Sequence, residues 1–273
     1  VNIASGAVLN ASAIRNGKGG TVVAWSDTQN SAGVTKVKGT LLARGGAEGG
    51  DGGRIETSGR WISTSGASGD ASAIKGLSGQ WLFDPYDIEI ISSFITNPSN
   101  PTGTWTATST NSQIQNTAIT SLLDAGTSVT ISTGTGTQST DGSITVNAPI
   151  VRGSATNAVN LTLSANKDIS INQQITLTGS GSKVQLNSGN SSASSSIVFA
   201  GAVSSDILSI DVTGSGTISQ SAAIQANNLR INATTTDVTL TNASNNFGSL
   251  ATNTRSLAIL SNQGIDTAQR IFT

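Results

Sequence analysis

The sequence predicts an all-β protein, a parallel β-helix (solenoid) with one short α-helix near residues 112–125. Three observations support this fold. Apolar strand cores recur over 128–273, glycine-rich corners separate short apolar segments over 41–90, and Ser, Thr and Asn make up 100 of the 273 residues. Apolar segments that return at a period of about 20–25 residues are typical of solenoids, in which each turn buries the apolar face of its neighbour.

The repeat is clearest in the C-terminal half, where we expect three short strands per turn and three columns of inward apolar residues. With a rise of about 4.8 Å per turn, about 11 to 12 turns would give a rod on the order of 55 Å. We assign Val129, Ile144, Leu161, Val184, Leu208, Leu229 and Leu257 to the first column, Ile169, Ile197, Ile218, Val238 and Ile265 to the second, and Ile175, Val203, Ile224, Phe247 and Ile271 to the third.

Glycine-rich corners dominate the N-terminal part. Glycine adopts backbone angles that are closed to other residues, so we expect tight, repeated corners wherever glycines cluster. Between these corners, residues 34–42 predict a strand whose two lysines, Lys36 and Lys38, face water. The glycines at the corners are Gly45, Gly46, Gly49, Gly50, Gly52, Gly53, Gly59 and Gly66.

Residues 112–126 change the period and predict the helix. Apolar side chains recur there at a spacing of four, which indicates one apolar helical face. Asn111 or Ser112 can cap its start and Gly126 suits its end. We expect the helix to lie across one open end or side of the coil. The chain is thus divided into coils over 1–91, a loop and short helix over 92–127, and coils of about 20–25 residues over 128–273.

The composition excludes several classes of protein. The net charge is −1 and 11% of the residues are charged, so the chain is not an electrostatic binder of nucleic acid. Cysteine and histidine are absent, which argues against zinc and His-based catalysis, and we expect no cofactor. Methionine is also absent, so we expect a processed chain or a fragment. No apolar run approaches the roughly 20 residues of a membrane span.

Two acidic segments are candidate sites. The segment over 45–55 is similar to one degenerate calcium-binding nonapeptide, but such repeats bind ions between stacked copies, so a glycine corner with a solvated Asp51 is favoured. Asp84, Asp87 and Glu89 lie close together in the sequence, as catalytic carboxylates do in β-helix glycosidases. No basic or sugar-binding aromatic residue adjoins them. We therefore expect a corner in which the Asp side chains bond local backbone.

Other residues invite a binding role. Trp25, Trp61 and Trp81 lie in apolar strand contexts and are expected in the core, whereas Trp105 lies in a polar alternating strand and is the candidate glycan contact. The threonine alternations at 102–110 and 133–137 are out of register with the repeat, which disfavours ice binding. Glycosylation is left open at the sequons of Asn10, Asn160, Asn190, Asn232 and Asn242.

A series of ordered motifs lies over residues 17–91. They read GGTVVAWSD at 19–27, ARGG at 43–46, GGDGG at 49–53, ETSG at 56–59 and WLFDPYDI at 81–88. Together they resemble the filamentous haemagglutinin family, the exoproteins of bacterial two-partner secretion. The resemblance implies a right-handed β-helix, secretion to the bacterial cell surface, and an outer-membrane secretion partner. Its signature positions, expected to be structural, are Gly45, Gly46, Gly49, Gly50, Asp51, Gly52, Gly53, Ser58, Gly59, Trp81, Asp84, Pro85 and Asp87.

The predicted function is non-enzymatic. We expect the shaft segment of a haemagglutinin-like adhesin, in contact with glycans or proteins of a host or neighbouring cell surface. The alternative is a processed subunit that stacks end to end with copies of itself into an extracellular filament or matrix fibre. A third hypothesis, a polysaccharide-acting enzyme, would need carboxylates aligned on neighbouring turns.

Overall fold

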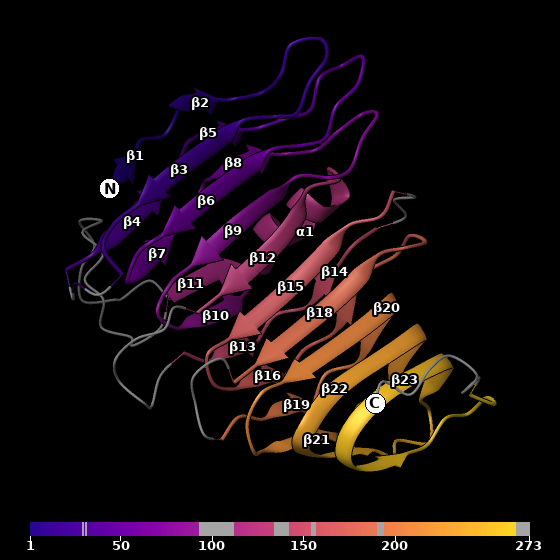
Figure 1. Cartoon of the computed structure of the whole chain (residues 1–273). Helices are drawn as coiled ribbons and strands as arrows, with labels where there is room; N and C mark the ends of the chain where they lie inside the picture. The colour runs from indigo at the N-terminus through magenta and orange to yellow at the C-terminus, as the bar shows by residue number, and fades with distance from the viewer. Residues whose placement is uncertain are drawn as a thin grey trace.

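The computed structural model describes residues 1–28, 30, 32–92, 112–133, 142–153, 157–189 and 194–265. These residues form a right-handed parallel β-helix, as predicted (Figure 1). All pairings between the strands are parallel, in one 20-stranded sheet and one 3-stranded sheet. Each turn stacks on the one before it, and the buried apolar side chains form one cluster from Val22 to Leu250.

The strands lie on three faces of the coil, each with its own column of inward side chains. The first face carries one strand from every turn, in chain order. Its strands are β3 (Thr21–Trp25), β6 (Arg54–Ser58), β9 (Gln80–Asp84), β12 (Ser128–Ser132), β15 (Asn160–Ala165), β18 (Lys183–Ser188) and the middle parts of β20 (Val203–Val212), β22 (Ile224–Leu240) and β23 (Asn246–Ile259).

The second face follows the first around each turn. Its strands, in spatial order, are β1 (Asn2–Ile3), β4 (Val34–Val37), β7 (Trp61–Ser63), β11 (Ser112–Gln115), β10 (Ile88–Ile91), β13 (Ile144–Val146), β16 (Ile169–Ile171), β19 (Ile197–Phe199), β21 (Thr217–Gln220) and the C-terminal parts of β22 and β23.

The third face completes each turn. It is interrupted by the helix α1 (Asn116–Asp124), which separates the 3-stranded sheet from the later strands. Its strands are β2 (Val8–Asn10), β5 (Thr40–Leu42), β8 (Ser68–Asp70), β14 (Ile150–Val151), β17 (Ile175–Thr176) and the N-terminal parts of β20, β22 and β23.

Strand register confirms most of the predicted columns. On the first face, Val129, Leu161, Val184, Leu208 and Leu229 are aligned from turn to turn, at steps within the predicted length after Leu161. The second-face column is also aligned, through Ile169, Ile197, Ile218 and Val238. So is the third-face column, through Ile175, Val203 and Ile224.

Four column assignments are wrong. Ile144 pairs with Ile169, and Leu257 pairs with Val238, so both belong to the second face. Leu257 therefore takes the place predicted for Ile265, and Phe247 pairs with Ala226 rather than lying level with Ile224. Inward residues of all three faces are equally apolar, so only the intervening corner lengths distinguish them. The described residues also place nine strands on the first face rather than 11 to 12 turns, because long corners use chain without adding turns. Ile271 lies outside the described residues.

The helix lies on the third face, where it covers apolar surface on the side of the coil (Figure 1). It begins at Asn116, later than predicted, because residues 112–115 form β11, which inserts out of chain order between β7 and β10. The Ser112 hydroxyl accepts the Ile62 N–H at 3.1 Å, and Gln115 holds the N-cap position, so the prediction that Ser112 caps the helix is wrong. Asn111, the other predicted cap, lies outside the described residues. The structure describes no other helix, and α1 is too short to cross a membrane.

The C-terminus of α1 ends as predicted at Gly126. This glycine has φ 82°, and its N–H donates to the Leu123 carbonyl while Thr127 N–H donates to that of Leu122, at 3.1 and 2.9 Å. This pair of hydrogen bonds closes a helix with a left-handed residue. Ile119, Leu122 and Leu123 are buried, so the apolar face of α1 substitutes for a strand in the core.

A buried arginine ties α1 to the turns beyond it. Arg152 is 1% exposed, and its guanidinium donates to the carbonyl oxygens of Leu123, Asn157 and Thr178 at 2.8–3.0 Å. Burial lowers the pKa of Arg152, and the charge of Asp124 opposes this effect. Since Leu123 lies in the last turn of α1, the cation also faces the negative end of the helix dipole.

We predict that Arg152→Met lowers the free energy of unfolding by about 3 kcal/mol, because it leaves buried carbonyl oxygens without a donor. Chemical denaturation followed by circular dichroism measures the change. Arg255→Met is the matched control, since Arg255 pairs with Asp237 at the surface, where solvent screening leaves little net stabilisation. Equal losses in the two variants would contradict a stabilising role for the buried arginine.

Candidate functional site

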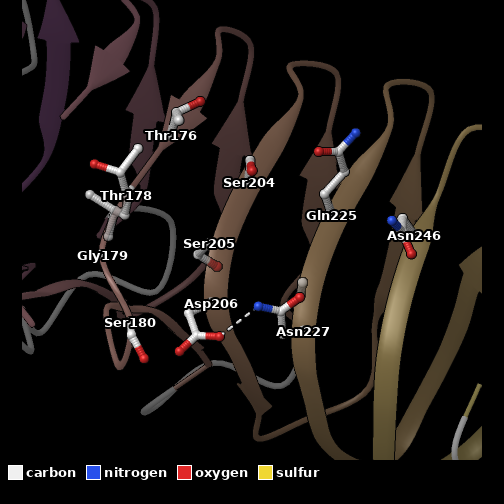
Figure 2. A pocket seen from close by; sticks show the side chains of 12 residues that line it. Thr176, Thr178, Gly179, Ser180, Ser204, Ser205, Asp206, Gln225, Asn227 and Asn246 are labelled. Carbon is white, nitrogen blue, oxygen red and sulfur yellow. Dashed lines mark hydrogen bonds between the residues drawn. The ribbon is translucent and has the colours of Figure 1, made fainter. Parts of the chain in front are cut away.

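A polar groove of about 490 Å³ crosses successive turns of the third face and its corner (Figure 2). Strand register brings Thr176, Ser204, Gln225 and Asn246 into one outward row. Residues next to them in the chain point inward and are buried, as the period of two along a strand requires. The groove thus presents one polar side chain per turn, about 4.8 Å apart.

A second row lies two residues further along each strand. Asp206 accepts hydrogen bonds from the Gly181 N–H at 2.6 Å and from the Asn227 side-chain amide at 2.8 Å, which Figure 2 shows as a dashed line. Asp206 is the only charged residue among those that line the groove. The groove is therefore almost neutral and lined by hydroxyl and amide groups.

The first row keeps its hydrogen-bonding capacity for a ligand. The side chains of Ser204, Gln225 and Asn246 make no hydrogen bond to another described residue, whereas the Thr176 hydroxyl accepts one from Gln174 at 2.7 Å. Hydroxyl and amide groups donate and accept. Such a row is suited to an extended, uncharged polymer that presents polar groups at a similar repeat.

Residues 11–20, 43–53 and 71–79 form three stacked loops that together make an arm projecting from the coil. The glycine-rich signature lies largely within this arm, whose base is its neck. Across this neck Gly20, Gly53 and Gly79 donate to Ala11, Ala43 and Ala71 respectively, at 2.7–2.8 Å. A methyl group on Gly52 would lie 1.8 Å from the Ala71 carbonyl oxygen. The close approach of neighbouring backbones, more than unusual backbone angles, thus explains why glycine occupies most positions of this run.

The same close approach holds along the rest of the run. An added Cβ would meet backbone at 2.0–2.4 Å at Gly45, Gly46, Gly50 and Gly53. Within the run, Gly50 also has a left-handed φ of 122°. Gly49 meets only the Asn16 side chain, at 3.5 Å. We conclude that these signature positions shape the arm.

Asp51, Ser58 and Gly59 also contact neighbouring turns. The Asp51 carboxylate accepts the Leu77 N–H at 2.8 Å. Ser58 is fully buried and its carbonyl oxygen accepts the Thr35 hydroxyl at 2.8 Å, and an added Cβ on Gly59 would lie 2.4 Å from the Ser26 hydroxyl. Among the described residues, no group of three or more acidic side chains could hold a metal ion.

The acidic corner over 84–89 separates its carboxylates. Asp87 accepts the N–H groups of Gly142 and Ser143 at 2.6 and 2.9 Å, so it bonds backbone, as predicted, but that of the next turn rather than its own. Glu89 instead accepts the Asn147 amide at 2.5 Å on the second face. The structure therefore does not bring these carboxylates together.

Asp84 has a different environment. Burial, together with the nearby charge of Glu56 on the preceding turn, raises the pKa of Asp84 to about 6. Glu56 itself pairs with Arg54 at 2.7 Å. Pro85 and Tyr86, which follow Asp84, are buried, and the Arg60 guanidinium lies 4.2 Å from the centre of the Tyr86 ring. The corner is therefore packed against the coil.

The tryptophans divide between core and surface. Trp81 is 2% exposed and stacks on Phe83 with ring centres 4.9 Å apart, as expected of a core residue. The core prediction is wrong for Trp25, which is 56% exposed, and Trp61 is half-buried. Both point outward because Val22, Ala24 and Ile62 occupy the inward positions of their strands. Trp105 lies outside the described residues.

Sequence reasoning missed the groove, although a signal was present. The residues that follow the correctly assigned column positions Ile175, Val203 and Ile224 are Thr176, Ser204 and Gln225. Reading one position beyond each core residue would have found the outward row. Comparison of the sequence with models of protein families and with curated proteins finds no match.

The raised pKa of Asp84 predicts a stability change with pH. Because the folded state holds the proton more tightly, the free energy of unfolding falls as pH rises from about 4 to about 6. Asp84→Asn is expected to remove this fall and to raise the melting temperature at pH 7. Thermal melts over pH 4–8 measure both effects.

Asp237→Asn is the control for that experiment. Hydrogen bonds from Arg255 and Ser256 lower the pKa of Asp237 to about 2, so its effect on stability lies below pH 4. Its pH profile between 4 and 6 should match that of the unsubstituted protein. If the melting temperature of Asp84→Asn still falls as the pH rises from 4 to 6, the raised pKa of Asp84 is not the cause of the fall.

Proposed function

We propose that the chain is a non-enzymatic shaft segment of a secreted, haemagglutinin-like adhesin at the bacterial cell surface. The observation that carries the proposal is the polar groove on the side of a continuous parallel coil. A solenoid of stacked turns gives length and stiffness from nearest-neighbour contacts alone. The groove presents one polar side chain per turn, so it offers similar contacts across the turns that it spans.

The partner that fits the groove is an extended, neutral polysaccharide of a host or neighbouring cell surface. Its hydroxyl groups match the hydroxyl and amide side chains of the row that contains Ser204, Gln225 and Asn246. Solvated hydrogen bonds contribute little each, so a single segment binds weakly. Many copies on one surface would raise the overall affinity through avidity.

Replacement of two groove side chains tests this proposal. We expect Gln225→Ala/Asn246→Ala to weaken binding to immobilised neutral polysaccharides about tenfold or more, because two side-chain amides per site are lost. Thr239→Ala, an exposed residue of the second face, is the matched control. Surface plasmon resonance over a panel of neutral and acidic polysaccharides gives the affinities. Equal affinity of both variants would contradict the groove as the contact surface.

The alternative function is end-to-end stacking into a filament. The observation that favours it is β23, whose 14 residues pair with β22 on one side and with no described strand on the other. An exposed strand edge can pair with another chain. Negative-stain electron microscopy over a concentration series distinguishes the two functions. Filaments of constant width that lengthen with concentration support stacking, whereas isolated rods at every concentration support the shaft.

A further inference from the structure

A cleft of about 310 Å³ lies between α1 and the third-face strand β8. It exists because a helix replaces a strand at this level of the coil. β8 pairs with β5 on one side, and on the other side it faces α1, which offers no strand edge for the ladder. The cleft is therefore a consequence of the turn that contains α1, and it shares no lining residue with the polar groove.

The inner end of the cleft is apolar and fixed in place. It is formed by the stacked pair Trp81 and Phe83, and the Trp81 indole N–H donates to the Thr57 hydroxyl at 3.1 Å. Gly69 of β8 lies directly over the indole, since an added Cβ would lie 2.1 Å from Trp81 Cζ3. Ala67 and Ala118 also line the cleft, so small residues keep it open.

The walls of the cleft are polar and uncharged. They include Ser68, Gln115, Thr117 and Ser121, and none of the lining residues carries a charge. Burial of a charged ligand group without a partner is costly, so this lining selects against ions. A molecule with an apolar face and several hydroxyl groups matches both the inner end and the walls.

One buried hydroxyl of the cleft lacks a partner. Thr64 is 3% exposed, and its Oγ1 makes no hydrogen bond to any described residue. A buried polar atom without a partner costs free energy, so replacement of this hydroxyl by a methyl group should not destabilise the fold. Less than 1 Å² of this oxygen is accessible to solvent, so a ligand in the cleft cannot reach it, and Thr64 belongs to the packed lining beneath the cleft.

We propose that this cleft binds one neutral sugar unit of a glycan. The choice of a sugar rests on the adhesive function proposed above, but the site is separate from the groove. The groove would hold a polymer lengthwise across the turns, whereas the cleft would accept a single ring. The volume lies at the lower end of the range for ligand pockets, which is consistent with one small ligand.

Saturation-transfer NMR with a panel of methyl hexosides and methyl N-acetylhexosaminides tests the proposal. We expect at least one neutral glycoside to bind with millimolar affinity, and methyl glucuronide not to bind. Ala118→Leu fills the cleft with only a small loss of helix propensity and should abolish binding. Thr64→Val removes a hydroxyl that a ligand in the cleft cannot reach, so it should leave both binding and the melting temperature unchanged. Thr239→Ala should bind like the unsubstituted protein.

Three results would overturn the proposal: no neutral glycoside binds, binding persists in a folded Ala118→Leu variant, or methyl glucuronide binds equally well. If Ala118→Leu does not fold, Ser121→Leu, on the exposed side of α1, takes its place. The experiments distinguish failure of the proposal for the cleft from failure of the proposed adhesive function. Polysaccharide binding that depends on Gln225 and Asn246 would remain while the methyl glycosides fail to bind.

Discussion

The structure depends on one constraint, the in-register stacking of inward apolar side chains on consecutive parallel strands. On the first face Val22, Ile55, Trp81 and Val129 follow one another from turn to turn, and the column continues to Leu250. Burial of each such side chain contributes about 1.5–3 kcal/mol relative to exposure. A slip of one residue would turn the whole set outward, so the register of every turn fixes that of the next.

This constraint acts on the strands and leaves the corners free. The glycine arm and the α1 insertion both occur where the chain passes between faces or leaves the ladder. Function is expected at such places, because they change shape without disturbing the core. The groove and the cleft fit this expectation, since the groove lies at an edge of the third face and the cleft beside its one interruption.

The outward charges follow the same turn-to-turn geometry. Burial alone would raise the pKa of Asp211, but hydrogen bonds from Arg230, Gln185 and Asn232 lower it. Gln185 lies on the preceding turn, and Arg230 and Asn232 lie on the following turn, brought together by the register of the first face. Asp84 has an acidic neighbour instead, and its pKa moves in the opposite direction. Stacking therefore decides which charges pair and which repel.

Sequence alone predicted the fold, the helix and most inward columns, because apolar spacing reports burial directly. It misplaced Ile144 and Leu257, since the face to which an inward residue belongs depends on corner lengths that vary. It placed Trp25 in the core because its neighbours in the sequence are apolar. Side chains alternate between inward and outward along β3, and this alternation points Trp25 outward. The groove and the cleft were not predicted, because each combines residues from several turns and is visible only once the register is known.

Distances between spin labels on one outward column test the stacking most directly. The chain contains no cysteine, so labelled pairs can be introduced without background. Thr130 and Ala251 lie five turns apart in one column, and Val23 and Ala251 lie eight turns apart. Double electron–electron resonance should give narrow distributions near ~24 Å and ~38 Å, one rise of about 4.8 Å per turn. Broad distributions, or distances that do not increase with the number of turns, would contradict the stacked coil.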